Sequence, residues 1–221
     1  MSLPVLSLLE TRVLGVLVEK ERTVPDTYPL TLNGLVAGCT QKTSRDPVID
    51  ASAPEVQAAV DRLRQLSLVV ETSGGRVMRY AHNVGRVLGV PTEVVALLAT
   101  LMLRGPQTPG EIRQNAERLH RFADISSVEA YLAELAARPS VALVVELARV
   151  PGAREARWMH LLSGVPAADL QAAPAVAQAP VELASTGEIV ALKNDLGTLR
   201  QEVSELRTQL GRVMDELGLS R

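Results

Sequence analysis

The tetrapeptide Arg79-Tyr80-Ala81-His82 is followed, 78 residues further along the chain (157 − 79 = 78), by Arg157-Trp158-Met159-His160. Each tetrapeptide closes a stretch whose pattern predicts three helices and a β-hairpin. A repeat of this length is too long for one unit of a solenoid and suits a duplicated small domain. The sequence therefore predicts two related domains in tandem, over residues 1–84 and 85–163.

Helix starts in the first copy are marked by capping boxes, in which a serine or threonine precedes a glutamate by three residues. The glycines at 74 and 75 suit a hairpin turn between two short apolar runs. In chain order, the predicted elements are a helix opened by Ser7 and Glu10, a helix over residues 30–37 with Pro29 at its first position, a helix opened by Ser52 and Glu55, and strands over residues 68–72 and 76–81.

The second copy repeats this order. It predicts a helix over residues 93–103, a helix from Thr108 to about Leu119, a helix capped by Ser126 and Glu129, and strands over residues 141–149 and 154–161. Three helices followed by a hairpin are typical of the winged helix-turn-helix, and two unrelated α+β modules are the alternative. The predicted fold class is mainly α with small β-hairpins (α+β), as two tandem winged helix-turn-helix domains plus a C-terminal coiled-coil helix.

The last part of the chain changes character twice. Residues 164–184 are rich in alanine and proline and predict a linker. Residues 185–221 open with a capping box and then carry apolar residues at spacings of three and four, as in a coiled coil. The expected dimerisation residues are Ile189, Leu192, Leu196, Leu199, Val203, Leu206, Leu210, Val213 and Leu217.

The charges of this tail favour a parallel homodimer. With Ile189 at heptad position a, the g positions carry Glu188, Asp195 and Glu202, and the e positions carry Lys193, Arg200 and Arg207. A parallel pair sets each acidic g against a basic e of the partner, whereas an antiparallel pair sets like charges together. A single amphipathic helix that folds back on the domains is the alternative.

Composition limits the function classes. The chain has 221 residues, 47% of them hydrophobic, and a net charge of −2. None of its segments carries a large excess of basic residues. No apolar run approaches the roughly 20 residues of a membrane helix, and the N-terminus lacks the basic start of a signal peptide. A cytoplasmic protein without membrane contact is expected. The single cysteine, Cys39, excludes an internal disulfide and a cysteine-rich zinc site.

No catalytic pattern stands out in the sequence. It contains no phosphate-binding glycine loop and no nucleophile elbow, and its three histidines lack metal-ligand spacing. His82 and His160 occupy the same place in both copies, which favours an architectural role. Cys39 is expected in the core, and an enzyme that depends on it is the weakest hypothesis. We therefore expect a non-enzymatic protein without cofactor or metal.

Binding is the function that remains. A winged helix that binds DNA inserts its third helix in the major groove and touches phosphates with its wing. The leading hypothesis is a dimeric DNA-associated or regulatory protein, and the alternative is a protein–protein adaptor that uses the same modules without DNA. The predicted contact residues for double-stranded DNA or a protein partner are Gln41, Lys42, Thr43, Arg45, Gln57, Arg62, Arg64, Arg76, Arg79, Arg113 and Arg154.

Three stretches resemble the bacterial YceH-like family: residues 28–48 (YPLTLNGLVAGCTQKTSRDPV), residues 103–111 (LRGPQTPGE) and residues 157–161 (RWMHL). The resemblance implies tandem winged-helix domains, a C-terminal coiled-coil segment and no established activity. It also draws attention to a dense polar cluster that is either a binding surface or a hydrogen-bonded loop between the second and third helices: Asn33, Gln41, Lys42, Thr43, Arg45 and Asp46.

Overall fold

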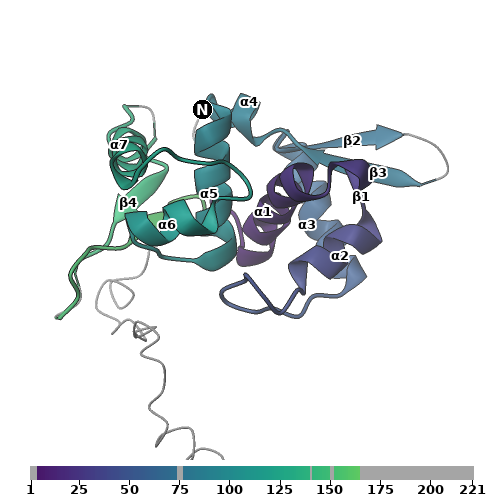
Figure 1. The fold of residues 1–221 in the computed structure, drawn as a ribbon. Helices are drawn as coiled ribbons and strands as arrows, with labels where there is room; N and C mark the ends of the chain where they lie inside the picture. The colour runs from purple at the N-terminus through teal and green to yellow at the C-terminus, as the bar shows by residue number, and fades with distance from the viewer. Residues whose placement is uncertain (1–3, 74–76, 140, 150–151, 165–221) are drawn as a thin grey trace, which may run out of the picture. The chain divides into compact units, whose positions relative to one another are not determined.

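The computed structural model describes residues 4–73, 77–139, 141–149 and 152–164, which form a mixed α+β structure with small antiparallel sheets (Figure 1). The first half follows the predicted order with one additional strand. Its elements are α1 (Leu8–Thr23), the 3₁₀ helix η1 (Pro25–Thr27), β1 (Leu30–Thr31), α2 (Leu32–Cys39), α3 (Ala53–Gln65), β2 (Val69–Ser73) and β3 (Met78–His82).

The strands of the first half form one antiparallel sheet in the order β1-β3-β2. The β2–β3 hairpin confirms its prediction, but the helix predicted over residues 30–37 begins later. Thr31 has an extended backbone, and its side chain accepts a hydrogen bond from the N–H of Gly34, so it caps α2. Leu30 and Thr31 therefore precede the helix, and they pair with Tyr80 and Arg79 of β3.

A short helix that was not predicted, α4 (Val84–Leu88), precedes the second repeat of this order. The second half then follows with shorter strands, as α5 (Thr92–Arg104), α6 (Pro109–Asn115), α7 (Ile125–Ala136), β4 (Val144–Glu146) and β5 (Trp158–His160). A single bridge between Gln107 and Trp158 stands where Leu30 pairs with Tyr80 in the first half. The threonine caps of α2 and α6 correspond as well, because Thr108 also accepts from a backbone N–H three residues on.

Two predicted boundaries in the second half are wrong. Helix α7 begins at Ile125, and its cap is Asp124, which accepts from the N–H of Ser127 at 2.7 Å, rather than Ser126. Helix α6 ends at Asn115 rather than near Leu119, because the chain turns at Ala116, whose carbonyl accepts from the N–H of His120. The predicted strands over residues 141–149 and 154–161 shorten to three residues each.

The repeated tetrapeptide has the same structural role in both halves. Arg79 donates to the carbonyl of Pro29 at 2.7 Å, and Arg157 donates to the carbonyl of Pro106 at 3.1 Å. Each arginine thus ties the last strand of its half to the segment that leads into the second helix. His82 and His160 close the two strands at equivalent pairings, opposite Val69 and Val144.

A single buried core runs through both halves, and α1 packs against α5 (Figure 1). A Cβ at Gly15 would lie 2.8 Å from Cγ of Leu103, so glycine permits this close approach of the two helices. The predicted boundary at residues 84 and 85 falls in α4, whose Val84 and Leu88 belong to the core. The predicted linker and coiled coil lie outside the described residues. None of the described helices is long and apolar enough to cross a membrane.

Candidate interaction surface

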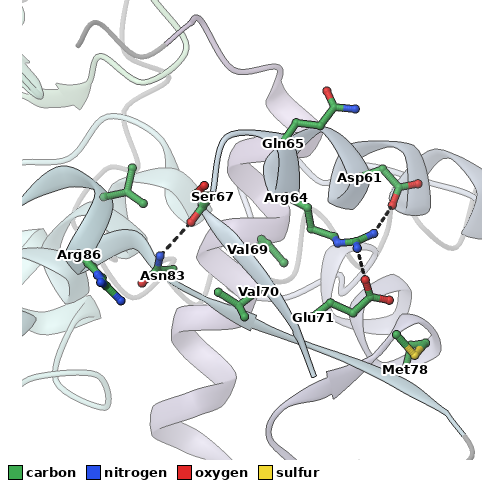
Figure 2. Close-up of a pocket in the computed structure, with 11 residues that line it drawn as sticks. Asp61, Arg64, Gln65, Ser67, Val69, Val70, Glu71, Met78, Asn83 and Arg86 are labelled. Atoms are coloured by element: carbon green, nitrogen blue, oxygen red, sulfur yellow. Dashed lines mark hydrogen bonds and ion pairs between the residues drawn. The ribbon is translucent and has the colours of Figure 1, made fainter. Parts of the chain in front are cut away.

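An open groove of about 1270 Å³ lies where the end of α3, the β2–β3 hairpin and α4 meet (Figure 2). It is the place where the hairpin, predicted to act as a wing, adjoins the third helix. Its walls carry charged and polar side chains, and its floor is partly apolar. The lining residues are Asp61, Arg64, Gln65, Ser67, Val69, Val70, Glu71, Met78, Asn83, Arg86 and Val87.

One wall of the groove is an ion-pair cluster. Arg64 donates to the carboxylate of Asp61 at 3.2 Å and also pairs with Glu71 of β2 (Figure 2). The guanidinium therefore lies between two carboxylates, which neutralise it. Of the predicted contact residues that the structure describes, only Arg64 lines this groove, and its charge is already used within the chain.

The floor and the opposite wall are different. Val70 and Met78 are each 44% exposed, which is high for side chains of this size. Arg86, on α4, is exposed, and no carboxylate of the described residues pairs with it. The groove thus combines exposed apolar side chains with one available positive charge.

The groove also runs along a free sheet edge. In the order β1-β3-β2, strand β2 pairs with β3 on one side and with no other strand in the part of the chain that the structure describes. Such an edge presents unpaired backbone N–H and C=O groups, which can accept another extended segment.

The other predicted contact residues on α3 form ion pairs or hydrogen bonds with residues of the same chain. Arg62 forms an ion pair with Glu10 of α1 at 3.0 Å. Gln57 donates to Asp61 at 3.0 Å and accepts from the hydroxyl of Tyr80 at 3.3 Å. The start of the helix carries Glu55, which accepts from the N–H of Ser52. Helix α3 therefore offers no unpaired arginine to a phosphate.

The polar loop between α2 and α3 contains the main correction to the predicted site. Arg45 is buried, with its Nε donating to the carbonyl of Gly38 and its Nη1 and Nη2 donating to Glu19 at 3.1 and 2.6 Å. A side chain without exposed surface cannot contact DNA. Its sequence neighbours led to the error, because Lys42 and Thr43 are exposed as expected. Arg45 instead fixes the loop to α1.

The pairing with Arg45 changes the pKa of the Glu19 carboxyl. Burial raises its pKa, but the hydrogen bond and charge of Arg45, together with the charge of Lys20, more than offset that effect. The net pKa lies below the ordinary value of glutamate, so Glu19 is ionised at neutral pH.

Gln41, also predicted as a contact, donates to the carbonyl of Thr43 at 3.0 Å. These bonds favour the hydrogen-bonded loop over the binding surface.

A second buried arginine was not predicted. Arg12 of α1 has no exposed surface and donates to the carbonyls of Cys39 at 3.3 Å and Pro47 at 2.6 Å, just before the loop and in its middle. Burial and the charge of Arg45 lower its pKa. Its position gives a signal that could have found it, since it stands in the apolar stripe that Leu9, Val13 and Val16 define at helical spacing.

The remaining predicted residues are scattered. Arg79 donates to the carbonyls of Thr27 and Pro29, and Arg154 is exposed with no ion pair among the described residues. Arg113 donates to the carbonyl of Ala123 and lines a smaller hollow of about 290 Å³ beside α6. Arg76 lies outside the described residues. The structure does not bring the ten predicted residues that it describes together into one surface.

Comparison with known proteins gives the family. A family model described as "Protein of unknown function, DUF480" matches residues 6–153. The chain belongs to this family. It is 60% identical over 211 residues to a UPF0502 protein of Dechloromonas aromatica, covering 95% of this chain and 96% of the relative. A UPF0502 protein of Methylibium petroleiphilum is 59% identical over 218 residues, covering 99% and 92%. The resemblance to an uncharacterised bacterial family is thereby confirmed.

Two further side chains of this family member bear on its chemistry. Burial raises the pKa of the Cys39 thiol to about 11, and the side chain has no exposed surface, as its predicted core position requires. Burial lowers the pKa of His160 to about 4, so it is neutral at physiological pH. Within the described ranges, no three acidic, histidine or cysteine side chains are grouped as a metal site would need.

Proposed function

We propose that the protein is a non-enzymatic adaptor built from two winged-helix modules, and that the groove beside β2 receives an extended segment of a protein partner. The order of helices and strands supports the winged-helix assignment, since a hairpin follows three helices in both halves. The buried and protonated Cys39 supports the absence of thiol chemistry.

The observation that carries this proposal is the composition of the groove. Val70 and Met78 offer apolar contact, the edge of β2 offers backbone hydrogen bonds, and Arg86 offers a charge. Strand addition at a sheet edge uses these components, with backbone bonds for affinity and side-chain contacts for specificity. The fitting partner is an extended peptide with alternating apolar residues and one carboxylate.

The same residues argue for an adaptor over a DNA reader. Arg45, Arg62 and Arg64 were predicted as contacts for DNA or a protein partner, and each is paired with a carboxylate of the chain. Duplex binding draws most of its non-specific affinity from cations that release counterions at phosphates. A chain of net charge −2 with these arginines already paired has little of that capacity.

Selection of short random peptides against the full-length protein tests the adaptor. We expect peptides with alternating apolar residues and an acidic residue, whose affinity by fluorescence anisotropy falls about tenfold or more in Val70→Asp and in Arg86→Glu. The matched controls are Val48→Asp and Arg149→Glu, which change an exposed valine and an exposed arginine away from the groove. Peptides whose affinity ignores the groove variants would refute the proposal.

A second candidate is duplex binding through the second half. Arg113, Arg118 and Arg121 are all exposed around α6, and no described carboxylate forms an ion pair with them. If these side chains neutralise phosphates, Arg113→Gln with Arg121→Gln should lower the slope of log affinity against log salt by about two. Undetectable binding of random duplex at low salt would remove this candidate.

We also propose that the C-terminal segment pairs two chains in parallel. The apolar heptads and the opposite charges at positions e and g of the sequence support this. Deletion of residues 185–221 should halve the mass measured by light scattering, and Val203→Lys should do the same. Gln201→Lys, at the outward heptad position f, is the control. A full-length monomer would refute the dimer.

A further inference from the structure

The hollow of about 290 Å³ beside α6 lies where the chain turns toward α7. The turn is closed by two backbone hydrogen bonds, because the N–H groups of Leu119 and His120 both donate to the carbonyl of Ala116. It thereby brings side chains that follow the helix to the same hollow as side chains of the helix itself. The lining residues are Gly110, Arg113, Gln114, Glu117, Arg121 and Phe122.

Three charged side chains line this hollow, and none of them forms an ion pair with a described residue. Arg113 and Glu117 are four residues apart, a spacing at which ion pairs form within a helix. Here α6 ends at Asn115, and Nη2 of Arg113 donates instead to the carbonyl of Ala123 at 3.3 Å, at the other end of the turn. This bond uses one of the five N–H groups of the guanidinium, so the others can donate to a ligand.

The cations and the amide of the lining favour a phosphate. Arg113, Arg121 and Gln114 are all exposed, and their N–H groups are donors. The three terminal oxygens of a phosphate monoester accept more hydrogen bonds than the two oxygens of a carboxylate, and arginine binds phosphate in a bidentate manner. The two guanidinium groups outweigh the single carboxylate of Glu117, so the lining attracts an anion.

The other side chains of the lining select what accompanies the phosphate. The carboxylate of Glu117 repels a bare anion but accepts a hydrogen bond from a hydroxyl group, so it favours a ligand with hydroxyls beside the phosphate. Phe122 is the only apolar side chain of the described lining, and it is 4% exposed. It therefore offers little surface on which a nucleobase stacks.

We propose that this hollow binds a small sugar phosphate, with the phosphate on Arg113 and Arg121 and a hydroxyl group on Glu117. Its volume lies near the lower limit of the roughly 300–1,000 Å³ of small-molecule sites, which suits one phosphorylated sugar and is small for a dinucleotide. The site belongs to the second half of the chain and is independent of the peptide groove beside β2.

Glucose phosphorylated on its primary hydroxyl is the probe, and glucose and inorganic phosphate are compared with it. We expect one saturable site per chain for glucose phosphate by isothermal titration of the full-length protein at low salt. Glucose should show no binding because it lacks the charge. Inorganic phosphate should bind at least about tenfold more weakly, because it is repelled by Glu117 and has no sugar hydroxyl to donate to it.

Three variants test the position of the site. Arg113→Gln and Arg121→Gln should each weaken the binding of glucose phosphate about tenfold or more, because each removes charge-assisted hydrogen bonds. Glu117→Ala should reduce the difference between glucose phosphate and inorganic phosphate to less than about threefold, since it removes both the acceptor and the repulsion. A residue that merely supports the fold would not change this ratio.

The matched control is Arg118→Gln, because Arg118 is an exposed cation of the same turn that does not line the hollow. It should leave the binding of glucose phosphate unchanged, whereas duplex binding by this half would weaken in all three arginine variants. Val70→Asp, in the peptide groove, should also have no effect.

Four results would overturn the proposal. They are the absence of saturable glucose phosphate binding, binding that survives in both Arg113→Gln and Arg121→Gln, an equal loss in Arg118→Gln, and equal affinity for glucose phosphate and inorganic phosphate. None of them affects the proposed adaptor, whose test uses peptides and the groove variants.

Discussion

The two halves of the chain share a plan but keep their first helices in place by different means. Helix α1 buries Glu10 and Arg12, and its Glu19 pairs with a buried arginine. Helix α5 buries apolar side chains from Val94 to Leu103, with Thr100 as the single polar one. The comparison shows that one topology tolerates either a charged or an apolar scaffold, provided that every buried charge finds a partner.

The largest expected effect tests the charged scaffold. Glu19→Gln removes the carboxylate that compensates Arg45, whose guanidinium then stays buried near Arg12. We expect a loss of about 3–5 kcal/mol in the free energy of unfolding, measured by urea titration with circular dichroism. The control is Arg22→Gln on the same helix, whose pair with Glu21 is exposed and should contribute below about 1 kcal/mol.

The same titration sharpens the comparison of the two halves. Trp158 is the only tryptophan and lies in β5 of the second half, so its fluorescence reports that half alone. Because the core is continuous, fluorescence and circular dichroism should shift together in Glu19→Gln. Separate transitions would show that the halves unfold independently.

The next effect is a loss of stability at low pH that arises from His160. The folded pKa of His160 is about 4, whereas an unfolded histidine titrates near its ordinary value of 6.5, so the unfolded chain binds the proton more readily. Stability from this site is complete above pH 6.5 and decreases by about 3 kcal/mol as pH falls to 4. Urea titrations across this range should show the decrease in wild type and in His82→Gln, the equivalent position of the first half. In His160→Gln the decrease should be smaller by about 3 kcal/mol, because only the contribution of His160 is removed.

Helix contact between the halves gives an intermediate effect. A Cβ at Gly15 would meet Leu103 Cγ at 2.8 Å, so Gly15→Ala should force α1 and α5 apart and cost about 1–3 kcal/mol. At Gly34 of α2 the nearest atom to an added Cβ lies at 3.6 Å, and Gly34→Ala should be neutral or slightly stabilising. Equal thermal stability of the two variants would mean that the helix contact is loosely packed.

The smallest effect compares the repeated arginines. Arg79→Ala and Arg157→Ala each remove a charge-assisted bond to a carbonyl ahead of the second helix, and each should cost about 1 kcal/mol in urea. Arg149→Ala, on the surface, should change stability by less than about 0.5 kcal/mol. A large loss of stability in only one of the two variants would show that Arg79 and Arg157 are not equivalent.

Local patterns predicted most helices and the first hairpin because their causes are local. The capping boxes at Ser7 and Thr108 form as expected, since each needs a side chain only three residues away. Strand β1 was missed because two residues carry no periodicity, and their pairing with β3 involves residues about 50 positions distant. The cap of α7 was misplaced because Asp124 and Ser126 both have capping side chains.

The sequence by itself determined the repeat, the order of the main helices and hairpins, and the burial of Cys39, because periodicity and capping act within a few residues. Only the tertiary structure decided which charges are available. Arg45 and Lys42 look alike in a polar loop, yet Arg45 pairs with Glu19, 26 residues away, while Lys42 faces solvent. The free energy of a charged side chain depends on its partners and its burial, and both are set by parts of the chain that are distant in sequence.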